Sequence, residues 1–195
     1  MRTRSLMLLF ITSISLQVHA QGNPEAGQVK GHTCTGCHGI EGYNNVYPTY
    51  KVPRLGGQGA SYVQSALRAY QGGERAHPTM QAHAQSLAEQ DMADIAAWLA
   101  GKELAEAATD PAEAPAESTM CQACHGADGR GTDPAYPVLA GQYESYLVKA
   151  LEDYRSGARR NAIMGGFAAQ LTDQDIKVLA RWYADQPGLR DLSGK

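Results

Sequence analysis

The sequence of 195 residues predicts an all-α protein built from two tandem copies of one small module. Three observations support this prediction. Apolar residues recur at helical spacing in several segments, and we find no convincing pattern of alternation that would indicate strands. The second half of the chain also repeats residues of the first half at a fixed distance. We therefore expect domains at 21–100 and 118–195, joined by a linker at 101–117.

The repeat shows as identical residues that lie 84 positions apart. So many identities at one offset indicate two copies of one supersecondary unit. The matched pairs include Pro53 and Pro137, Leu55 and Leu139, Gly57 and Gly141, Gln58 and Gln142, Tyr62 and Tyr146, Tyr70 and Tyr154, Arg75 and Arg159, Met80 and Met164, and Trp98 and Trp182.

The first copy begins with Asn23-Pro24, a helix cap followed by proline at the first helical position. We expect this short helix to run into the segment 34–38. A loop rich in Gly, Pro and Tyr follows at 39–59, and Gly72-Gly73 ends the next helix. The apolar positions of the middle helices are Val63, Ala66, Leu67 and Tyr70 in the first copy, and Leu147, Ala150, Leu151 and Tyr154 in the second.

Each copy is expected to close with a further helix. Thr172 and Asp175 predict a capping box at its start in the second copy. The first copy has Ala88 in place of Thr172, so either Ser86 or no side chain caps there. The apolar positions are Met92, Ile95, Ala96 and Leu99, then Ile176, Leu179, Ala180 and Tyr183.

All four cysteines of the chain lie in two Cys-x-x-Cys-His motifs, Cys34–His38 and Cys121–His125. This motif is the attachment signature of a c-type haem. Two thiols on one helical turn can bond the two vinyl groups of a porphyrin, and the next residue then lies under the iron as its proximal ligand. We therefore predict two covalent haem c groups, held by Cys34, Cys37, Cys121 and Cys124, with His38 and His125 as iron ligands.

Three other uses of these cysteines are possible. A thioredoxin-like dithiol usually accompanies a βαβ pattern, which we do not find. One zinc site of four cysteines would leave both histidines unexplained, and the motifs are 87 positions apart, far beyond zinc-ribbon spacing. Two simple disulfides would suit an oxidising compartment. The histidine that follows both pairs favours haem.

The second axial ligand of each iron is predicted to be Met80 or Met164, which match each other in the repeat and are expected in loops. Met92 fits the apolar face of a helix, and Met120 is tethered on the wrong side of its haem. His77 and His83 flank Met80 and remain rival ligands of the first iron. His/Met ligation raises the reduction potential and leaves no open iron position, which favours electron transfer over catalysis.

The first 20 residues have the pattern of a secretory signal peptide. Arg2 and Arg4 precede the mostly apolar run 6–16, and Val18-His19-Ala20 resembles a cleavage site. We expect export to the periplasm and no membrane span after cleavage, because no later stretch is apolar enough. Cleavage would make the net charge of −3 two units more negative, which disfavours nucleic acid as a partner. The linker, rich in Ala, Glu and Pro, is predicted to be a solvated spacer.

Beyond the leader, the whole chain resembles the dihaem cytochromes of the cytochrome c4 type, which are two fused class I cytochrome c domains. The resemblance implies electron transport in the periplasm, commonly from a cytochrome bc1 complex to a haem–copper terminal oxidase, with haems that face each other across the domain interface. The departure from the pattern is an extended loop at 43–50. The residues that resemble the family are Cys34–His38 with Gly39 and Gly42, Gly56-Gly57-Gln58, Met80, Cys121–His125 with Gly126 and Gly129, Ala140-Gly141-Gln142, Met164 and 171–175.

Three functions are compatible with these residues. The first is a soluble carrier that is not an enzyme. The second is the electron-accepting subunit of a periplasmic dehydrogenase such as a flavocytochrome, which would need a partner chain because the sequence has no flavin or nucleotide fingerprint. The third is a dihaem enzyme with an open iron, such as a peroxidase, which requires that one methionine does not bind.

Overall fold

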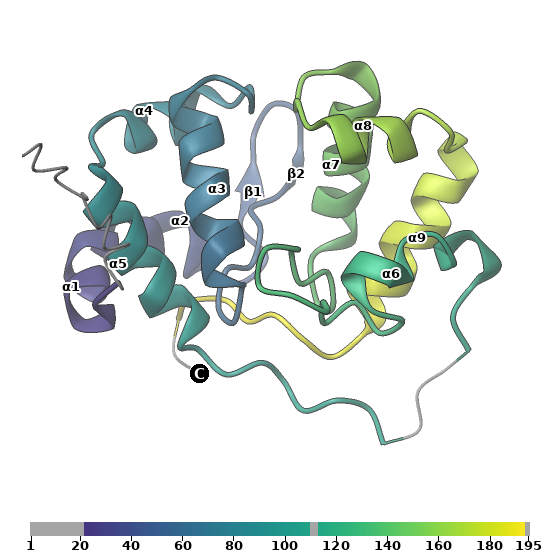
Figure 1. Cartoon of the computed structure of the whole chain (residues 1–195), viewed down its shortest axis with the longest axis horizontal. Helices are drawn as coiled ribbons and strands as arrows, with labels where there is room; N and C mark the ends of the chain where they lie inside the picture. The colour runs from purple at the N-terminus through teal and green to yellow at the C-terminus, as the bar shows by residue number, and fades with distance from the viewer. Residues whose placement is uncertain (1–21, 110–112, 194–195) are drawn as a thin grey trace, which may run out of the picture.

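Two small helical modules lie side by side in the computed structural model, which describes residues 22–109 and 113–193 (Figure 1). The predicted signal peptide lies outside the described residues. Within the described ranges, no helix is long and apolar enough to cross a membrane. The structure confirms the helices and the two modules that the sequence predicts.

The first module contains the helices of the first sequence copy, and they begin and end close to the predicted signals. Asn23 Oδ1 accepts a hydrogen bond from Ala26 N at 3.0 Å, so the predicted N-cap is present. The elements are α1 (Pro24–Lys30), the 3-10 turn η1 (Gly31–Cys34), α2 (Thr35–His38), α3 (Ala60–Gln71), α4 (Pro78–Gln85) and α5 (Glu89–Ala100).

The second module repeats this order without a counterpart of α1. The linker leads directly into a 3-10 turn, whose Ser118 is fully buried. Thr172 and Asp175 form the predicted capping box, with Asp175 N donating to Thr172 Oγ1 at 3.1 Å. The elements are η2 (Ala116–Ser118), α6 (Gln122–His125), α7 (Glu144–Ser156), α8 (Ala162–Ala168) and α9 (Asp173–Asp185).

Close approach of backbones fixes α1 against α5 in the first module. A Cβ atom on Gly27 would overlap the backbone carbonyl of Asp94, so only glycine fits at the crossing. At the start of α5, Ala88 N donates to Asp91 Oδ2 at 2.9 Å, and Ser86 Oγ instead donates to His83 O. No side chain therefore caps this helix N-terminus at Ala88. Of the two predicted possibilities, a cap by Ser86 or no cap, the structure has no cap.

Two local features differ from the sequence-based expectations. The long loop contains a two-stranded antiparallel hairpin, β1 (Asn44–Asn45) with β2 (Tyr50–Lys51), where no strand was expected. Met80 and Met164 lie in the first turns of α4 and α8, so the expectation that both lie in loops was wrong. These helices are short, and each begins with a capping side chain, which makes up for their weak apolar pattern.

The modules dock through hydrogen bonds that obey an approximate twofold symmetry. Gln58 of the first module accepts from Val138 N at 2.8 Å and donates to Val138 O at 3.0 Å. Gln142 of the second does the same with Arg54, accepting from its N at 2.9 Å and donating to its O at 2.9 Å. Because Gln58 and Arg54 correspond to Gln142 and Val138 in the repeat, each copy contributes the same contact.

A second symmetric contact joins the loops that follow α3 and α7. Arg75 and Arg159, which correspond in the repeat, form an antiparallel bridge. Ala76 N donates to Ala158 O at 3.1 Å, and Arg160 N donates to Glu74 O at 2.7 Å. Two elements of the interface therefore use repeated sequence on both sides.

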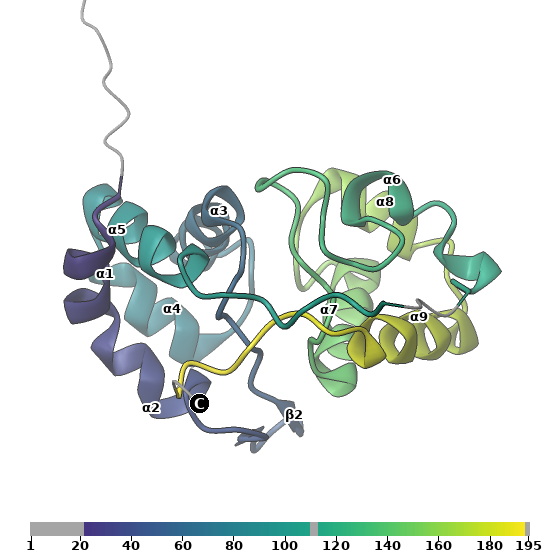
Figure 2. The same ribbon diagram turned by 90° about the horizontal axis from the view of Figure 1, so that it is seen from below.

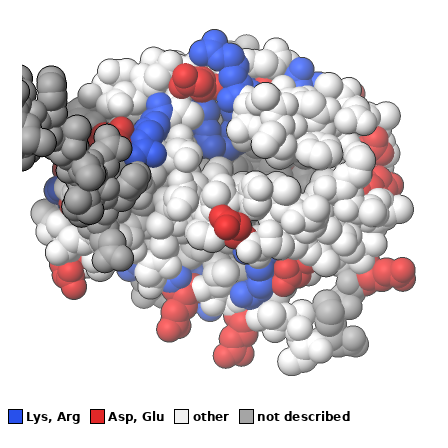
Figure 3. All heavy atoms as spheres, in the orientation of Figure 1, with Lys and Arg blue, Asp and Glu red and all other residues white. Residues whose placement is uncertain are grey.

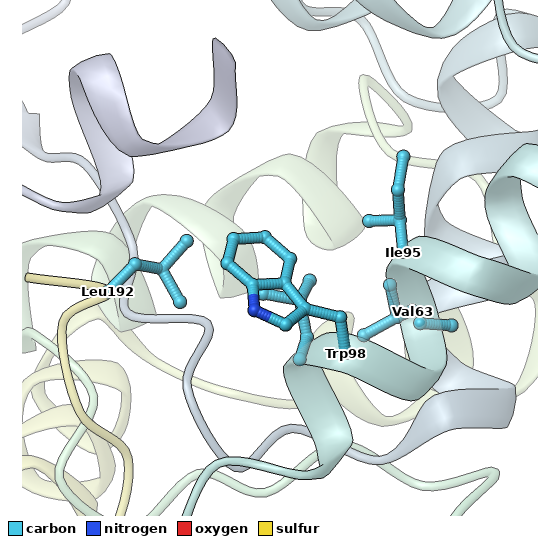
Figure 4. Close-up of a cluster of buried hydrophobic side chains, with 6 residues drawn as sticks. Val63, Ile95, Trp98 and Leu192 are labelled. Carbon is cyan, nitrogen blue, oxygen red and sulfur yellow. The ribbon is translucent and has the colours of Figure 1, made fainter. Parts of the chain in front are cut away.

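The C-terminal segment 187–193 leaves the second module and returns to the first (Figure 2). Arg190 exchanges backbone hydrogen bonds with Gly56, and Leu192 N donates to His38 O at 3.1 Å. The side chain of Leu192 points toward Trp98 and completes the apolar core of the first module (Figure 4). Part of the sequence assigned to the second domain is thus packed on the first.

The start of the linker also packs between the modules. Leu104 contacts a small apolar cluster of Val138, Ala140 and Leu189, and Ala105 N donates to Gly188 O at 2.8 Å. This portion is therefore more than a solvated spacer, although the domain boundaries remain a prediction.

Replacing Gln58 with Ala should destabilise the docked pair. The substitution leaves the N–H and C=O of Val138 without partners in a buried interface, which costs about 1–3 kcal/mol. Thermal unfolding followed by circular dichroism should show a lower midpoint for Gln58→Ala. The exposed Gln28 on α1 provides the control, because Gln28→Ala should leave the midpoint unchanged. Equal midpoints for both variants would show that the glutamine contact does not hold the modules together.

Candidate haem sites

The two motif histidines are held in the same way in both modules. His38 Nδ1 lies 2.7 Å from Pro53 O, and His125 Nδ1 lies 3.0 Å from Pro137 O. A carbonyl can only accept, so Nδ1 carries the proton and Nε2 keeps its lone pair. Both imidazoles are buried, and burial lowers the pKa of each. The neutral imidazole that an iron requires is therefore the favoured form.

Pro53 and Pro137 are functional residues that the motif analysis did not identify. Their carbonyls accept hydrogen bonds from the histidine rings and fix the orientation of these rings, as groups that hydrogen-bond a metal ligand usually do. A signal was available, because the two prolines correspond in the repeat. Sequence alone does not show that the shared feature is a backbone oxygen.

No disulfide joins any of the four cysteines, all of which lie within the described residues. Cys34 packs against the core of the first module and Cys121 against that of the second, so the thiols do not converge on one four-cysteine site. Burial raises the pKa of both of these thiols. The arrangement is that of two separate pairs, each on one helical turn beside a buried histidine.

Met80 and Met164 occupy equivalent positions, the third residue of a short helix whose N-cap side chain bonds the methionine backbone. His77 Nδ1 accepts from Met80 N at 3.2 Å, and Asn161 Oδ1 accepts from Met164 N at 3.0 Å. His77 thus has the capping role that an asparagine has in the second copy, which favours Met80 over His77 as a ligand. His83 is exposed, and its counterpart is Phe167, which cannot bind a metal.

The helices that carry the methionines are anchored to the rest of each module. Gln71 Nε2 donates to Leu87 O at 3.1 Å, and the corresponding Arg155 Nη1 donates to Leu171 O at 3.1 Å. The side chains of His77 and His83 also lie near enough to His38 to contribute to its lowered pKa, after the larger effect of burial. The first methionine helix therefore lies in the neighbourhood of the histidine of its own module. Met92, by contrast, is fully buried in the core, as its helical position indicated.

The residues present fit a c-type haem in each module. Each set contains two cysteine sulfurs, a neutral histidine whose Nε2 keeps its lone pair and a thioether, which are the donors that haem c takes. The interface also buries the guanidinium of Arg159, whose Nε has no hydrogen-bond partner among the described residues. An anionic group bound nearby would satisfy that atom, and haem c carries anionic propionates.

Comparisons with known proteins agree with this geometry. The cytochrome c family model matches residues 25–103 and again 100–183. The chain is 32% identical to cytochrome c4 of Azotobacter vinelandii over 92% of this chain and 97% of that protein. It is 29% identical to a thiosulfate dehydrogenase electron acceptor of Stutzerimonas stutzeri, over 87% of this chain and 84% of that one.

A solved structure of similar fold is the reduced recombinant cytochrome c4 from Pseudomonas stutzeri. It matches with a TM-score of 0.68 and 32% sequence identity, covering 87% of this chain and all of that chain. The family model covers both haem-attachment motifs, and the solved structure matches over its whole length. The chain therefore belongs to the cytochrome c family, as a protein of the cytochrome c4 type with two tandem cytochrome c domains and two covalently bound haem c groups.

Proposed function

We propose that this protein is a periplasmic electron carrier that passes electrons through two His/Met-ligated haems to a terminal oxidase. The observation that carries the proposal is the symmetric interface, because paired hydrogen bonds from Gln58 and Gln142 hold two modules with the same ligand geometry in one fixed relation. A signal peptide at 1–20 would deliver the chain to the compartment where such haems are attached.

The ligand assignment follows from what each side chain can do. Haem iron supplies one-electron chemistry when bound. His38 and His125 present a neutral Nε2, and Met80 and Met164 each offer a soft thioether that favours ferrous iron. If these four residues ligate the two irons, no iron position would remain for oxygen or peroxide. We therefore infer a carrier rather than a dihaem peroxidase.

The second module exposes apolar side chains next to the residues that are predicted to hold its haem. Ile163 is 62% exposed beside Met164, and Phe167 and Met120 are also exposed. Their counterparts in the first module are polar: Thr79, His83 and Thr33. Figure 3 shows few charged side chains over much of the surface that the second module presents in the orientation of Figure 1. We infer that the partner docks there through a largely uncharged surface.

A second candidate function is electron acceptance from a dehydrogenase, and the similarity to a thiosulfate dehydrogenase electron acceptor favours it. The sequence has no flavin or nucleotide fingerprint, so this role would require a separate catalytic chain. Purification from the native cells separates the two functions. A carrier is recovered free or with membrane oxidases and a bc1 complex, whereas a dehydrogenase subunit is recovered in a fixed complex.

Replacing Cys121 and Cys124 with Ala should remove one haem and leave the first module loaded, because each pair serves its own module. The haem content of the denatured protein, measured from the pyridine haemochrome spectrum, should fall by half. Release of both haems from the wild-type protein into acidified organic solvent would show that attachment is not covalent.

Replacing Met164 with Ala should open one iron to carbon monoxide in the reduced protein and lower the potential of that haem, because a soft ligand to ferrous iron is lost. Absorption spectra with and without carbon monoxide provide the measurement. Met120→Ala is the matched control, since Met120 precedes Cys121 and should leave both spectra unchanged. The same test at Met80 decides between this residue and His77 or His83, and an unchanged spectrum would rule out the methionine.

Oxidation of the reduced protein by a terminal oxidase should depend only weakly on ionic strength. Residues 21–100 carry five basic and six acidic side chains, and residues 118–195 carry nine of each. Rim charges act mainly on the association rate, so a nearly balanced surface gives little steering. The rate should be measured across a series of salt concentrations. A steep fall with added salt would reveal docking through a charged face.

A further inference from the structure

The C-terminal segment of the chain reaches the back of the first haem motif. Leu192 N donates to the backbone oxygen of His38 at 3.1 Å, although Leu192 follows the helices of the second module. Just before this contact, Arg190 exchanges backbone hydrogen bonds with Gly56. The residue between these two anchors is Asp191, whose side chain is 11% exposed. A carboxylate from the far end of the chain is therefore held beside the first motif.

The second module makes the equivalent backbone bond from its own loop. Gly131 N donates to the backbone oxygen of His125 at 2.8 Å, and Gly131 belongs to the loop that directly follows the second motif. In the first module the corresponding loop contains the hairpin of β1 and β2, and the backbone oxygen of His38 accepts from Leu192. The C-terminal segment thus supplies to the first module a bond that the second module makes within itself.

The Asp191 carboxylate forms an ion pair with Arg54, the residue that follows Pro53. Arg54 Nε donates to Asp191 Oδ2 at 3.0 Å, and Arg54 Nη1 donates to Gly141 O at 2.6 Å. Pro53 O in turn accepts from Nδ1 of His38. The ion pair therefore adjoins the segment that orients the histidine of the first haem site.

Tyr143 of the second module completes the surroundings of the ion pair. Its hydroxyl donates to the Asp191 carboxylate at 3.0 Å and accepts from Gly42 N at 2.7 Å. Its ring lies under the Arg54 guanidinium, whose Cζ is 4.2 Å from the ring centroid. Protein groups therefore hold both charges in place, and each charge has a fixed position relative to the first motif.

Among the described residues, no ion pair occupies the equivalent place in the second module. Val138 stands in the position of Arg54 in the repeat and is buried in an apolar cluster. The ion pair of Arg130 with Asp128 lies in the loop after the second motif instead, and the Asp128 side chain is 45% exposed. The backbone contacts behind the two motif histidines are thus alike, whereas the charges behind them differ.

We propose that the ion pair of Asp191 with Arg54 is a positioning element of the first haem alone, which sets the charge behind His38 and thereby the reduction potential of that haem. The inference rests on the proposed ligation of the first iron by His38. A negative charge near the iron stabilises the ferric state, because oxidation adds positive charge, and a positive charge stabilises the ferrous state. In the intact ion pair the two effects oppose each other.

Each charge is expected to act in its own direction. Asp191→Asn leaves the Arg54 charge unbalanced, so the potential of the first haem should rise. Arg54→Gln leaves the Asp191 charge unbalanced, so the same potential should fall. The double variant lacks both charges, and its potential should lie between those of the single variants. The substitutions keep the backbone bonds of Arg54 with Gln142 and of Leu192 with His38.

The test is a redox titration of the dihaem protein followed by proton NMR, in which the shifted methyl signals report each haem separately. The potential of the second haem should stay unchanged in all three variants. The exposed ion pair of Arg68 with Glu89 in the first module is the matched control, because water screens its charges. Arg68→Gln and Glu89→Gln should leave both potentials where they are.

The signs of the shifts distinguish an electrostatic role from a merely structural one. A fall of the first potential in both single variants would mean that the ion pair only holds the segment in place, and would overturn the proposal. Equal shifts at both haems, or no shift at either, would also overturn it. Each single variant has its own expected sign, so either one tests the proposal by itself.

The NMR spectrum of the wild-type protein separates this inference from the proposed function. It shows whether a histidine ligates the first iron. If no histidine does, the proposed function and this inference both fail. If a histidine does, and the opposite shifts are not observed, only this inference fails.

Discussion

The docking of the modules depends on four hydrogen bonds between two glutamine amides and the backbone of the opposite module. Each amide uses both its oxygen and its NH2 group, so Gln58 and Gln142 fix position and orientation together. The segments they bind lie directly after Pro53 and Pro137, whose carbonyls orient the iron-binding histidines. Module docking and ligand orientation are therefore properties of the same two short segments. The C-terminal segment reinforces this arrangement, because Arg190 pairs with Gly56 and Leu192 N bonds His38 O.

The structure also suggests why the haem belongs to the core. Each module has only a small cluster of buried apolar side chains, and a module of about 80 residues is marginal by itself. Each module buries a histidine whose Nε2 keeps its lone pair, and among the described residues the buried Arg75 and Arg159 form no ion pair with a carboxylate. Such groups are costly in a finished core. They become favourable when a cofactor supplies an iron for the imidazoles and carboxylates for the guanidinium groups.

Much of the fold and of the candidate haem sites could be predicted from sequence, because the relevant signals are local. Helix caps at Asn23 and Thr172, the glycines after α3 and both haem motifs each depend on a few adjacent residues, and the repeat identified equivalent positions. The features that were missed depend on contacts far along the chain. Leu192 enters the first module's core only because the modules dock, and the hairpin bonds the second module through Lys51 N and Ser145 Oγ. The helices around Met80 and Met164 are stabilised by caps and by anchoring to neighbours, which apolar periodicity does not report.

We propose that one chain holds two haems as a single electron-transfer unit. Flash reduction of the fully oxidised protein by a substoichiometric reductant tests it most directly, with absorbance followed as the electron redistributes between the haems. We expect a first-order phase whose rate constant is independent of protein concentration, because the transfer occurs within the docked pair. A rate that rises in proportion to protein concentration would mean that electrons move only between molecules, and would contradict a single electron-transfer unit.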